Sequence, residues 1–284
     1  MVLNMANIDK QFRKLRHIMV QTAHKAGRGH LPSAFSCVEI IRVLYGGILR
    51  VRPQEPGWPE RDRFILSKGH GCLALYAVLA EAGFFPAREL ESFCAYGSLL
   101  GGHPERQTSI GVEAGTGSLG HGPSLAVGMA LAARLDGSPA RFFVLCGDGE
   151  CNEGSVWEAC LSAAKHKLDS LTLLIDSNKQ QSWDDVENIL PLEPLADKFR
   201  AFGMEVAEVD GHDVEAMRRL FSRLPLTPGK PGCVICHTVK GKGISFMEGN
   251  LAWHHKSRLS AEELQALYEG IEAYPAGVSA KERS

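Results

Sequence analysis

Two polar segments that follow apolar runs have the composition of a metal and phosphate site. In RFFVLCGDGE, Asp148 lies between Gly147 and Gly149, and Asn178 follows the next apolar run, LTLLIDS, 30 positions later. The two glycines allow a tight turn and a close approach of the backbone to a ligand. Oxygen ligands from Asp148 and Asn178 suit Mg²⁺, which takes one or two protein oxygens beside phosphate and water. The G-x-G-x-x-G pattern of a dinucleotide site is not matched, which disfavours an NAD-dependent oxidoreductase.

Histidines recur in loops at the ends of the predicted elements. Most of them stand beside glycine, and they are His30, His70, His103, His121 and the pair His254–His255. A single loop histidine is more often structural than catalytic. Imidazoles are nevertheless the side chains best suited to proton transfer near neutral pH. Five such loop sites at strand or helix ends are therefore hard to attribute to accident, and they make the prediction of a site more specific.

Apolar runs alternate with amphipathic segments along the chain, and these elements must position the polar residues. Buried strands are predicted at 64–66, 142–146, 171–175, 204–209 and 233–238. Helices are predicted at 8–26, 36–45, 72–82, 88–95, 125–135, 156–166, 195–202, 214–224 and 261–271. This alternation indicates an α/β fold with a doubly wound, mainly parallel sheet and helices on both faces. Ligands of such sheets bind beyond the carboxyl ends of the strands, where Asp148 and Asn178 are placed.

The pattern continues without a linker, an internal repeat or a low-complexity tract. Residues 1–274 are therefore predicted to form a single domain, and the small, polar tail at 275–284 is expected to fray. The segment from Ser36 to Glu39 matches a capping box, which predicts that the second helix begins at Ser36.

Composition excludes several classes of protein. The formal net charge is −2, from 31 basic and 33 acidic residues, which provides no basic surface for nucleic acid or an anionic membrane. No apolar run reaches the roughly 18 residues that span a bilayer. The first twenty residues lack the apolar region and cleavage site of a signal peptide. We therefore expect a cytoplasmic enzyme with no nucleic-acid and no membrane partner.

The eight cysteines are expected to be reduced and mostly buried in such a protein. One pair, Cys233-Val-Ile-Cys236-His237, matches the C-x-x-C-H pattern of haem attachment. The surrounding residues are β-branched and apolar, as in a buried strand. Strand residues three apart point to opposite faces, so this pair is interpreted as structural.

Five ordered blocks resemble the N-terminal part of transketolase, a family of thiamine-diphosphate enzymes. They are LSKGHGCLALY, GGHPE, GVEAGTGSLGHG, GDGECNEGSVWEA followed by DSN, and HTVKGKGISF. The resemblance covers about residues 10–258 and implies the diphosphate-binding module of the family.

Site residues follow from this resemblance by position. Asp148, Asn178 and the backbone oxygen of Gln180 would hold Mg²⁺ or Ca²⁺ against the diphosphate. The other residues implied to contact thiamine diphosphate are Ser33, His70, Gly117, Leu119, His121, Gly149 and, in a loop that closes over the site, Lys242. The resemblance also implies that the donor ketose is faced by His30, His103 and His254. These histidines would bind its hydroxyl groups and assist proton transfer.

Two residues depart from full-length transketolases, and one pair of residues bears on assembly. His121 stands where those enzymes usually carry Gln, and the block that contains it, GSLGHG, is similar to the split-subunit branch of the family. Arg28 stands where a smaller or different residue is usual, which leaves the donor or acceptor preference open. Glu153 and Glu158 resemble the acidic pair at the family's subunit interface, although Glu153 also suits a helix N-terminus.

The pyrimidine-binding module of the family has no counterpart after Trp253. The resemblance thus implies a two-gene transketolase, in which this chain and a separate pyrimidine-module subunit form an α₂β₂ heterotetramer. Together they would transfer a two-carbon ketol unit from a ketose, such as a sugar phosphate, to an aldose. The alternatives are an E1α-like subunit of a 2-oxo-acid dehydrogenase, disfavoured by GGHPE and TGSLGHG, and a non-catalytic homologue.

Overall fold

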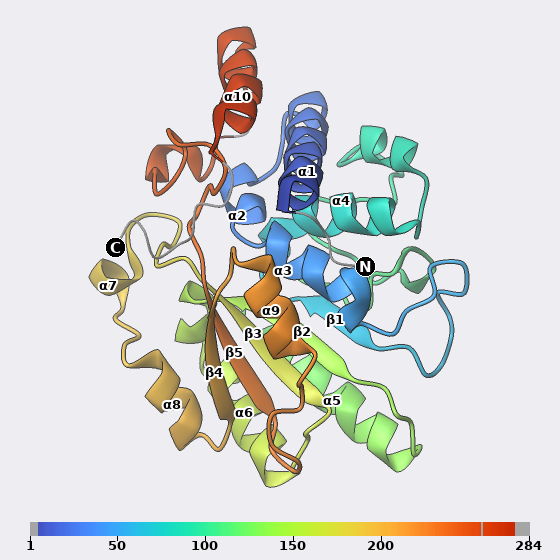
Figure 1. Ribbon diagram of the computed structural model, residues 1–284. Helices are drawn as coiled ribbons and strands as arrows, with labels where there is room; N and C mark the ends of the chain where they lie inside the picture. The colour runs from blue at the N-terminus through green and yellow to red at the C-terminus, as the bar shows by residue number, and fades with distance from the viewer. Residues whose placement is uncertain (1–4, 257, 276–284) are drawn as a thin grey trace.

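A parallel five-stranded sheet forms the centre of the computed structural model, which describes residues 5–256 and 258–275. The strands lie in the order β1-β2-β3-β5-β4 (Figure 1). They are β1 (Arg63–Leu66), β2 (Phe142–Gly147), β3 (Leu171–Ser177), β4 (Glu205–Asp210) and β5 (Gly232–His237). All five predicted strands are confirmed, with boundaries that shift by at most two residues.

Ten α-helices of the described residues accompany the sheet. They are α1 (Met5–Ala26), α2 (Leu31–Phe35), α3 (Val38–Val43), α4 (Cys72–Ala82), α5 (His121–Leu135), α6 (Gly154–Lys165), α7 (Val186–Ile189), α8 (Leu195–Ala201), α9 (Val214–Phe221) and α10 (Ala261–Ala273). Other helical turns, of the 3₁₀ or π type, lie at Leu44–Ile48, Gly69–Gly71, Ala87–Ser92, Thr108–Ile110, Gly149–Asn152 and Leu251–Trp253. The four-residue helix α7 has no counterpart among the predicted elements.

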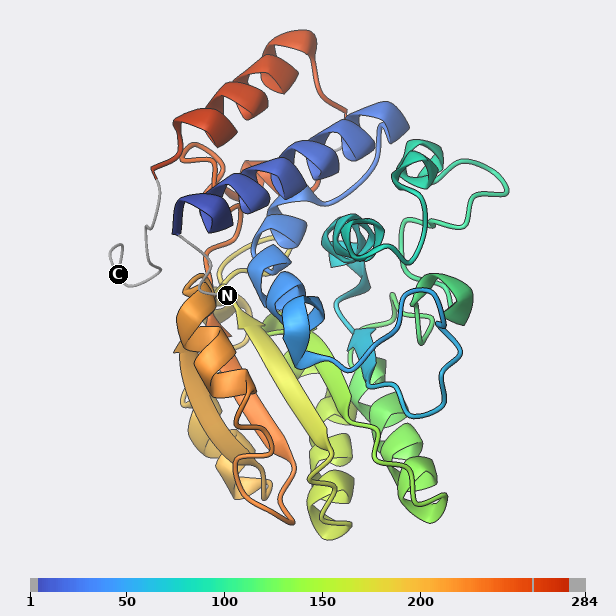
Figure 2. The same ribbon diagram turned by 45° about the vertical axis from the view of Figure 1, so that its right-hand side comes forward.

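The helices cover both faces of the sheet, as a doubly wound fold requires. One apolar cluster joins α5, α6 and α8 to one face of the strands. A second cluster joins α3, α4 and α9 to the other face and extends outward to α1 and α10. Figure 2 shows α10 lying beside α1 on the outside of the molecule. The predicted fold class is confirmed.

The cysteines are free thiols, all eight within the described residues, and Cys94 is the one that is not fully buried. On β5, Cys233 belongs to one apolar cluster and Cys236 to the other. Their side chains therefore lie on opposite faces of the sheet, as the strand interpretation predicted.

The capping box predicted at Ser36 is wrong. The hydroxyl of Ser36 donates to the carbonyl oxygen of Ser33 and to Asp176 Oδ2, at 3.0 and 2.6 Å. Helix α3 begins two residues later, at Val38, and the short helix α2 precedes it. A partner distant in sequence has thus replaced the local cap.

The helix predicted at 88–95 is a 3₁₀ helix over Ala87–Ser92. Leu90 and Phe93 are the buried residues of this region. Their spacing of three is compatible with the three residues per turn of a 3₁₀ helix.

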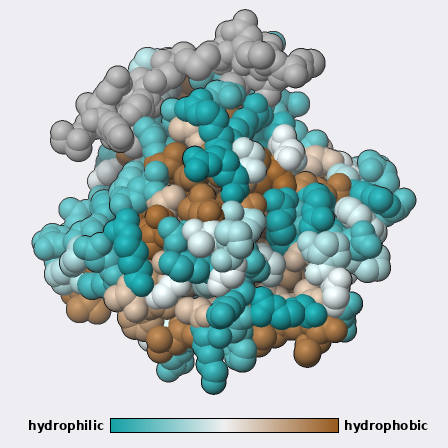
Figure 3. Space-filling model, turned by 60° about the horizontal axis from the view of Figure 1, so that its bottom comes forward, coloured by the Kyte–Doolittle hydropathy of each residue, from teal (hydrophilic) through white to brown (hydrophobic). Residues whose placement is uncertain are grey.

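Apolar residues reach the surface in several separate places between polar ones on the face seen in Figure 3. No helix of the described residues is both long and apolar enough to cross a bilayer. The fraying predicted for residues 275–284 falls outside the described residues, except for Pro275.

Candidate active site

The ends of β2 and β3 bring Asp148 and Asn178 to one edge of the sheet. The two strands are neighbours, and Gly147 of β2 is paired with Asp176 of β3. Asp148 follows the first of these residues directly, and Asn178 lies two positions after the second. Both side chains line a cavity of about 390 Å³, together with Gln180. The strand-end placement predicted from the sequence is therefore present in the structure.

Backbone N–H groups orient the oxygens at this edge. Asp148 Oδ1 accepts from the N–H of Gly149 at 2.8 Å, and Oδ2 accepts from the N–H of Lys179 at 2.6 Å. Asn178 Oδ1 accepts from the N–H of Gln180 at 3.1 Å. Burial and the nearby Asp176 carboxylate raise the pKa of Asp148 to about 6. A cation bound to the Asp148 carboxylate would relieve that penalty on the charged form.

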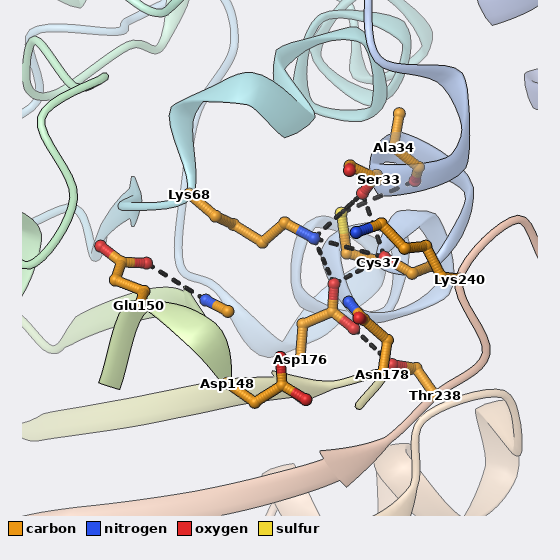
Figure 4. Close-up of polar contacts among 12 residues, drawn as sticks. Ser33, Ala34, Cys37, Lys68, Asp148, Glu150, Asp176, Asn178, Thr238 and Lys240 are labelled. Carbon is orange, nitrogen blue, oxygen red and sulfur yellow. Dashed lines mark hydrogen bonds and ion pairs between the residues drawn. The ribbon is translucent and has the colours of Figure 1, made fainter. Parts of the chain in front are cut away.

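A fully buried ion pair lies beneath the edge (Figure 4). Lys68 Nζ contacts Asp176 Oδ2 and donates to the carbonyl oxygen of Ser33 at 3.0 Å. Ser36 and Thr238 also donate to the Asp176 carboxylate. Burial alone would lower the pKa of Lys68, but Asp176 overcomes this and raises it. This cluster was not predicted from the sequence, although Lys68 and Asp176 stand inside the blocks SKGH and DSN.

Lys240 is a second cation of the cavity that was not predicted from the sequence. Its Nζ donates to the carbonyl oxygens of Gln180 and Gln181, at 3.2 and 3.0 Å. Burial and the charge of Lys68 lower its pKa to about 8, so it remains mostly protonated near neutral pH. A cation here suits an anionic ligand such as a phosphate group.

Lys242, the lysine selected from the sequence, lies elsewhere. Its Nζ is 5.4 Å from the centroid of the Tyr274 ring, and its carbonyl oxygen accepts from Arg16 Nε at 2.8 Å. The structure therefore brings Lys240, not Lys242, to the cavity with Asp148. The cofactor contact of Lys242 stays a prediction.

Three of the selected histidines gather beside the cavity. The ring centroid of His30 lies 5.8 Å from the centroid of His70 and 5.8 Å from that of His254. Burial and the neighbouring His255 lower the pKa of His30 to about 4, and burial with Lys240 lowers that of His254 to about 3. Burial and Lys68 also place the pKa of His70 well below its usual value. These three imidazoles are thus neutral near neutral pH, when each can donate one hydrogen bond and accept another.

The loop that carries Gly117 borders the same region. A Cβ atom at Gly117, where φ is +142°, would come within 3.3 Å of the His103 ring. This glycine therefore allows His103, which is exposed, to pack directly on the loop backbone. Leu119 is partly buried, and its carbonyl oxygen lies 3.0 Å from Nδ1 of the exposed His121, the first residue of α5.

Glu150 ties this loop to the turn that carries Asp148. One of its carboxylate oxygens accepts from Ser67 Oγ and from the N–H of Gly120 at 2.8 Å, and the other accepts from the N–H of Gly147 at 3.1 Å. A single buried carboxylate thus fixes three loops at the strand ends. This role of Glu150 was not predicted from the sequence.

Some buried polar atoms have no hydrogen-bond partner, and one of their residues, Gln180, lines the cavity. Among the described residues, those that lack any hydrogen bond are Ser33 Oγ, Thr116 Oγ1, Ser177 Oγ, Gln180 Oε1, Gln181 Nε2 and His254 Nδ1. They come from the same segments as the predicted site residues. Buried polar groups are normally paired, and an unpaired one costs about 1–3 kcal/mol. Such atoms on the segments of the predicted site fit a polar ligand of several groups, such as a metal-bound diphosphate.

Comparison with known proteins gives a consistent result. Residues 8–276 match the family model described as "Transketolase, thiamine diphosphate binding domain". The chain is 40% identical over 266 residues to a 6-deoxy-6-sulfo-D-fructose transketolase subunit of Clostridium sp. (strain MSTE9), covering 94% of this chain and 96% of that protein. It is 43% identical over 268 residues to an apulose-4-phosphate transketolase subunit of Actinobacillus succinogenes, covering 94% of this chain and 97% of that protein.

The fold is also similar to solved structures. The crystal structure of a transketolase from Campylobacter jejuni superposes with a TM-score of 0.87 at 31% identity. That match covers 98% of this chain but 44% of the other chain. The chain therefore spans less than half the length of this larger relative.

Proposed function

The chain belongs to the transketolase family, as its thiamine-diphosphate-binding domain, and from this premise we propose that it is the N-terminal subunit of a two-subunit transketolase. The assembled enzyme transfers a two-carbon ketol unit from a ketose to an aldose. The observation that carries this proposal is the set of unpaired buried polar atoms on the segments that carry the predicted site residues, among them Ser177 and Gln180 beside Asn178 in the chain.

In this proposal, a divalent metal, Mg²⁺ or Ca²⁺, is held by Asp148, Asn178 and the carbonyl oxygen of Gln180. The support for it is the donor set, since hard carboxylate and amide oxygens are the ligands that these cations prefer. Lys240 lies beside the same carbonyl oxygen and provides positive charge for a diphosphate. Ser33, His70 and the backbone near Gly117 and Gly149 complete the predicted contacts.

Thiamine diphosphate, when bound, supplies the electron sink that this chemistry needs. The chain's own residues orient the ligands and manage protons. His30 and His254 are uncharged near neutral pH because their pKa values are low. They can accept a hydrogen bond from a ketose hydroxyl or donate one to it, and His103 shares this proposed role.

The partner in this proposal is a separate protein that carries the pyrimidine module. Two relatives that the chain covers over 96% and 97% of their length are named as transketolase subunits, which supports it. An exposed surface on this chain supports it further, since Leu125 and Leu135 of α5 and Leu161 of α6 are exposed and apolar. Glu153 and Glu158 are exposed nearby along the chain. We propose an α₂β₂ heterotetramer that acts in the cytoplasm.

The proposal does not specify the ketose donor, because the two relatives are named for different ketoses. The test is to combine the purified chain with a candidate protein that carries the pyrimidine module, and to supply 6-deoxy-6-sulfofructose, apulose 4-phosphate or xylulose 5-phosphate. Ketol transfer from a ketose, dependent on both proteins, thiamine diphosphate and Mg²⁺, is the expected result. Full activity of this chain alone contradicts the two-subunit form. Turnover of 2-oxo acids instead of ketoses indicates an E1α-like chain, and cofactor binding without turnover of either indicates a non-catalytic homologue.

A further inference from the structure

A histidine that the proposed function does not use completes a compact cluster. One ring nitrogen of each of His30, His254 and His255 lies within 4.8 Å of those of the other two. The ring centroids of His254 and His255 are 4.4 Å apart, and those of His30 and His255 are 5.7 Å apart. His255 is exposed, His30 is partly buried and His254 is 4% exposed. The cluster therefore extends from the interior of the site to solvent.

From this arrangement we propose that His30, His254 and His255 form a binding site for a borderline divalent metal ion, represented by Zn²⁺. It is separate from the hard-cation site at Asp148 and Asn178. Three imidazole nitrogens leave the fourth tetrahedral position open to water or another ligand, as in zinc sites with three protein ligands. Nitrogen donors favour Zn²⁺, Co²⁺, Ni²⁺ and Cu²⁺ over Mg²⁺ or Ca²⁺.

The geometry supports this site. His254 Nδ1 is a buried nitrogen without a hydrogen-bond partner, so it is available to a ligand. The three nitrogens here lie within 4.8 Å of one another. Zinc–nitrogen bonds of about 2.0–2.1 Å require a shorter separation between these nitrogens. The exposed His255 has room to make that approach.

Positive charge in the cavity opposes the binding of any cation. Lys240 lowers the pKa of both His30 and His254, and Lys68 lowers that of His254. A hard cation without strong nitrogen bonding cannot offset this repulsion, whereas a transition metal forms directional bonds to all three rings. The site is therefore selective for borderline metals by the nature of its donors.

Metal bound to this site is expected to affect catalysis, an expectation that rests on the proposed function. His30 and His254 are the histidines proposed to face the donor ketose, so a metal bound to them competes with that substrate. Zinc is accordingly expected to inhibit ketol transfer in competition with the donor. Binding of the metal itself does not depend on the activity, and the two can be measured separately.

The binding test is titration of the full chain with Co²⁺ in the presence of excess Mg²⁺, which occupies the hard-cation site. We expect the visible bands of one four-coordinate, nitrogen-ligated Co²⁺ per chain, displaced by Zn²⁺. His255→Ala should weaken Co²⁺ binding by at least the roughly 10–100-fold that accompanies loss of even an outer-shell partner. His24→Gln, which alters an exposed histidine of α1, is the matched control and should bind like the unaltered chain.

Absence of four-coordinate bands, or equal Co²⁺ affinity in the chain with and without His255→Ala, overturns the site. Sulfur-to-cobalt charge-transfer bands would assign the metal to a cysteine and also overturn it. A second measurement uses the assembled enzyme, where His255→Ala should raise the zinc concentration for half-inhibition by a similar factor. If no ketose is turned over, the proposed function fails and the Co²⁺ titration still decides the metal site.

Discussion

Two buried ion-pair clusters in this molecule differ in whether their polar groups are all satisfied. In one, Arg16 and Glu39 form a 2.5 Å ion pair with side chains 7% and 6% exposed. In the other, Lys68 and Asp176 are 1% and 0% exposed. Burial and charge are therefore alike, and they do not distinguish a structural cluster from a ligand site.

The Arg16–Glu39 cluster is closed by the chain itself. Glu39 also meets His212 Nδ1 at 3.3 Å, and His212 Nε2 accepts from the N–H of Val239 at 2.9 Å. Arg16 Nε donates to the Lys242 carbonyl oxygen. The Lys68–Asp176 cluster, in contrast, is bordered by unpaired hydroxyls. These differences indicate that unsatisfied atoms, more than buried charge, mark where a ligand belongs.

The largest effect is expected from Lys68→Met, which leaves the buried carboxylate of Asp176 without its cation. Removing one partner of a buried ion pair costs about 3–5 kcal/mol. The free energy of unfolding, measured by urea denaturation, should fall by that amount. The double variant Lys68→Met/Asp176→Leu removes both charges and should recover much of the loss. Unchanged stability of the single variant would show that the two charges are not coupled.

Glu39→Gln tests the closed cluster. Burial alone would raise the pKa of Glu39, but Arg16 and His212 lower it from 4.5 to about 2. That difference corresponds to about 3 kcal/mol of stability. Because the folded pKa lies below the unfolded one, this stability is present above about pH 5 and is lost as the pH falls toward 2.

The variant should therefore be less stable near neutral pH and should lose less stability than the unaltered chain as the solution is acidified. Urea denaturation at several pH values measures both quantities. Cofactor binding by the folded variant should be unchanged, since Glu39 belongs to the closed cluster. Weakened cofactor binding would show that the two clusters are not independent.

Asp148→Ala tests the proposed ligand site that borders the Lys68–Asp176 cluster, and here the affinity for a ligand should fall while the stability of the chain should not. Loss of this carboxylate should reduce the affinity for thiamine diphosphate in the presence of Mg²⁺ by at least about 100-fold, or about 2.7 kcal/mol. Stability without ligand should be unchanged or higher, because the buried carboxylate has a raised pKa and is costly to charge. Calorimetric titration and urea denaturation measure the two effects. Equal affinity in both chains would remove Asp148 from the site.

The sequence was informative where the determinants are local. The strands are apolar runs, and Asp148 and Asn178 directly follow two of them, so their shared edge could be predicted. The capping box at Ser36 failed because its hydroxyl donates to Asp176, 140 positions away. Tertiary packing decides whether the hydroxyl caps its own helix or binds a distant carboxylate. A local sequence pattern does not show that packing.

Other site residues were missed for the same physical reason. Lys68 and Asp176 are 108 positions apart, and Glu150 and Ser67 are 83 positions apart. Lys240 and Lys242 are chemically equivalent in sequence, and only the path of the loop places one in the cavity and the other beside Tyr274. Contacts between residues far apart in the sequence therefore place these site residues, and local patterns do not predict them.

The smallest effect is expected from two buried serines that lie three residues apart. One has a hydrogen-bonded hydroxyl and the other has an unpaired hydroxyl. Both side chains are fully buried, but Ser33 Oγ has no partner, whereas Ser36 Oγ donates to Asp176. Ser36→Ala should destabilise the chain by about 1–2 kcal/mol, because it removes a hydrogen bond to a charged group. Ser33→Ala should leave the unliganded chain equally stable or about 1 kcal/mol more stable, because it removes an unpaired hydroxyl.

Cofactor binding should reverse the order of this pair. If Ser33 Oγ is unpaired because a ligand completes it, Ser33→Ala lowers the affinity for thiamine diphosphate by about tenfold, the equivalent of one hydrogen bond. Each variant thus serves as the control for the other, in urea denaturation and in calorimetric titration. Destabilisation by Ser33→Ala with unchanged affinity would mean that the unpaired hydroxyl is a packing feature. The unpaired atoms that border the Lys68–Asp176 cluster would then no longer identify the ligand site.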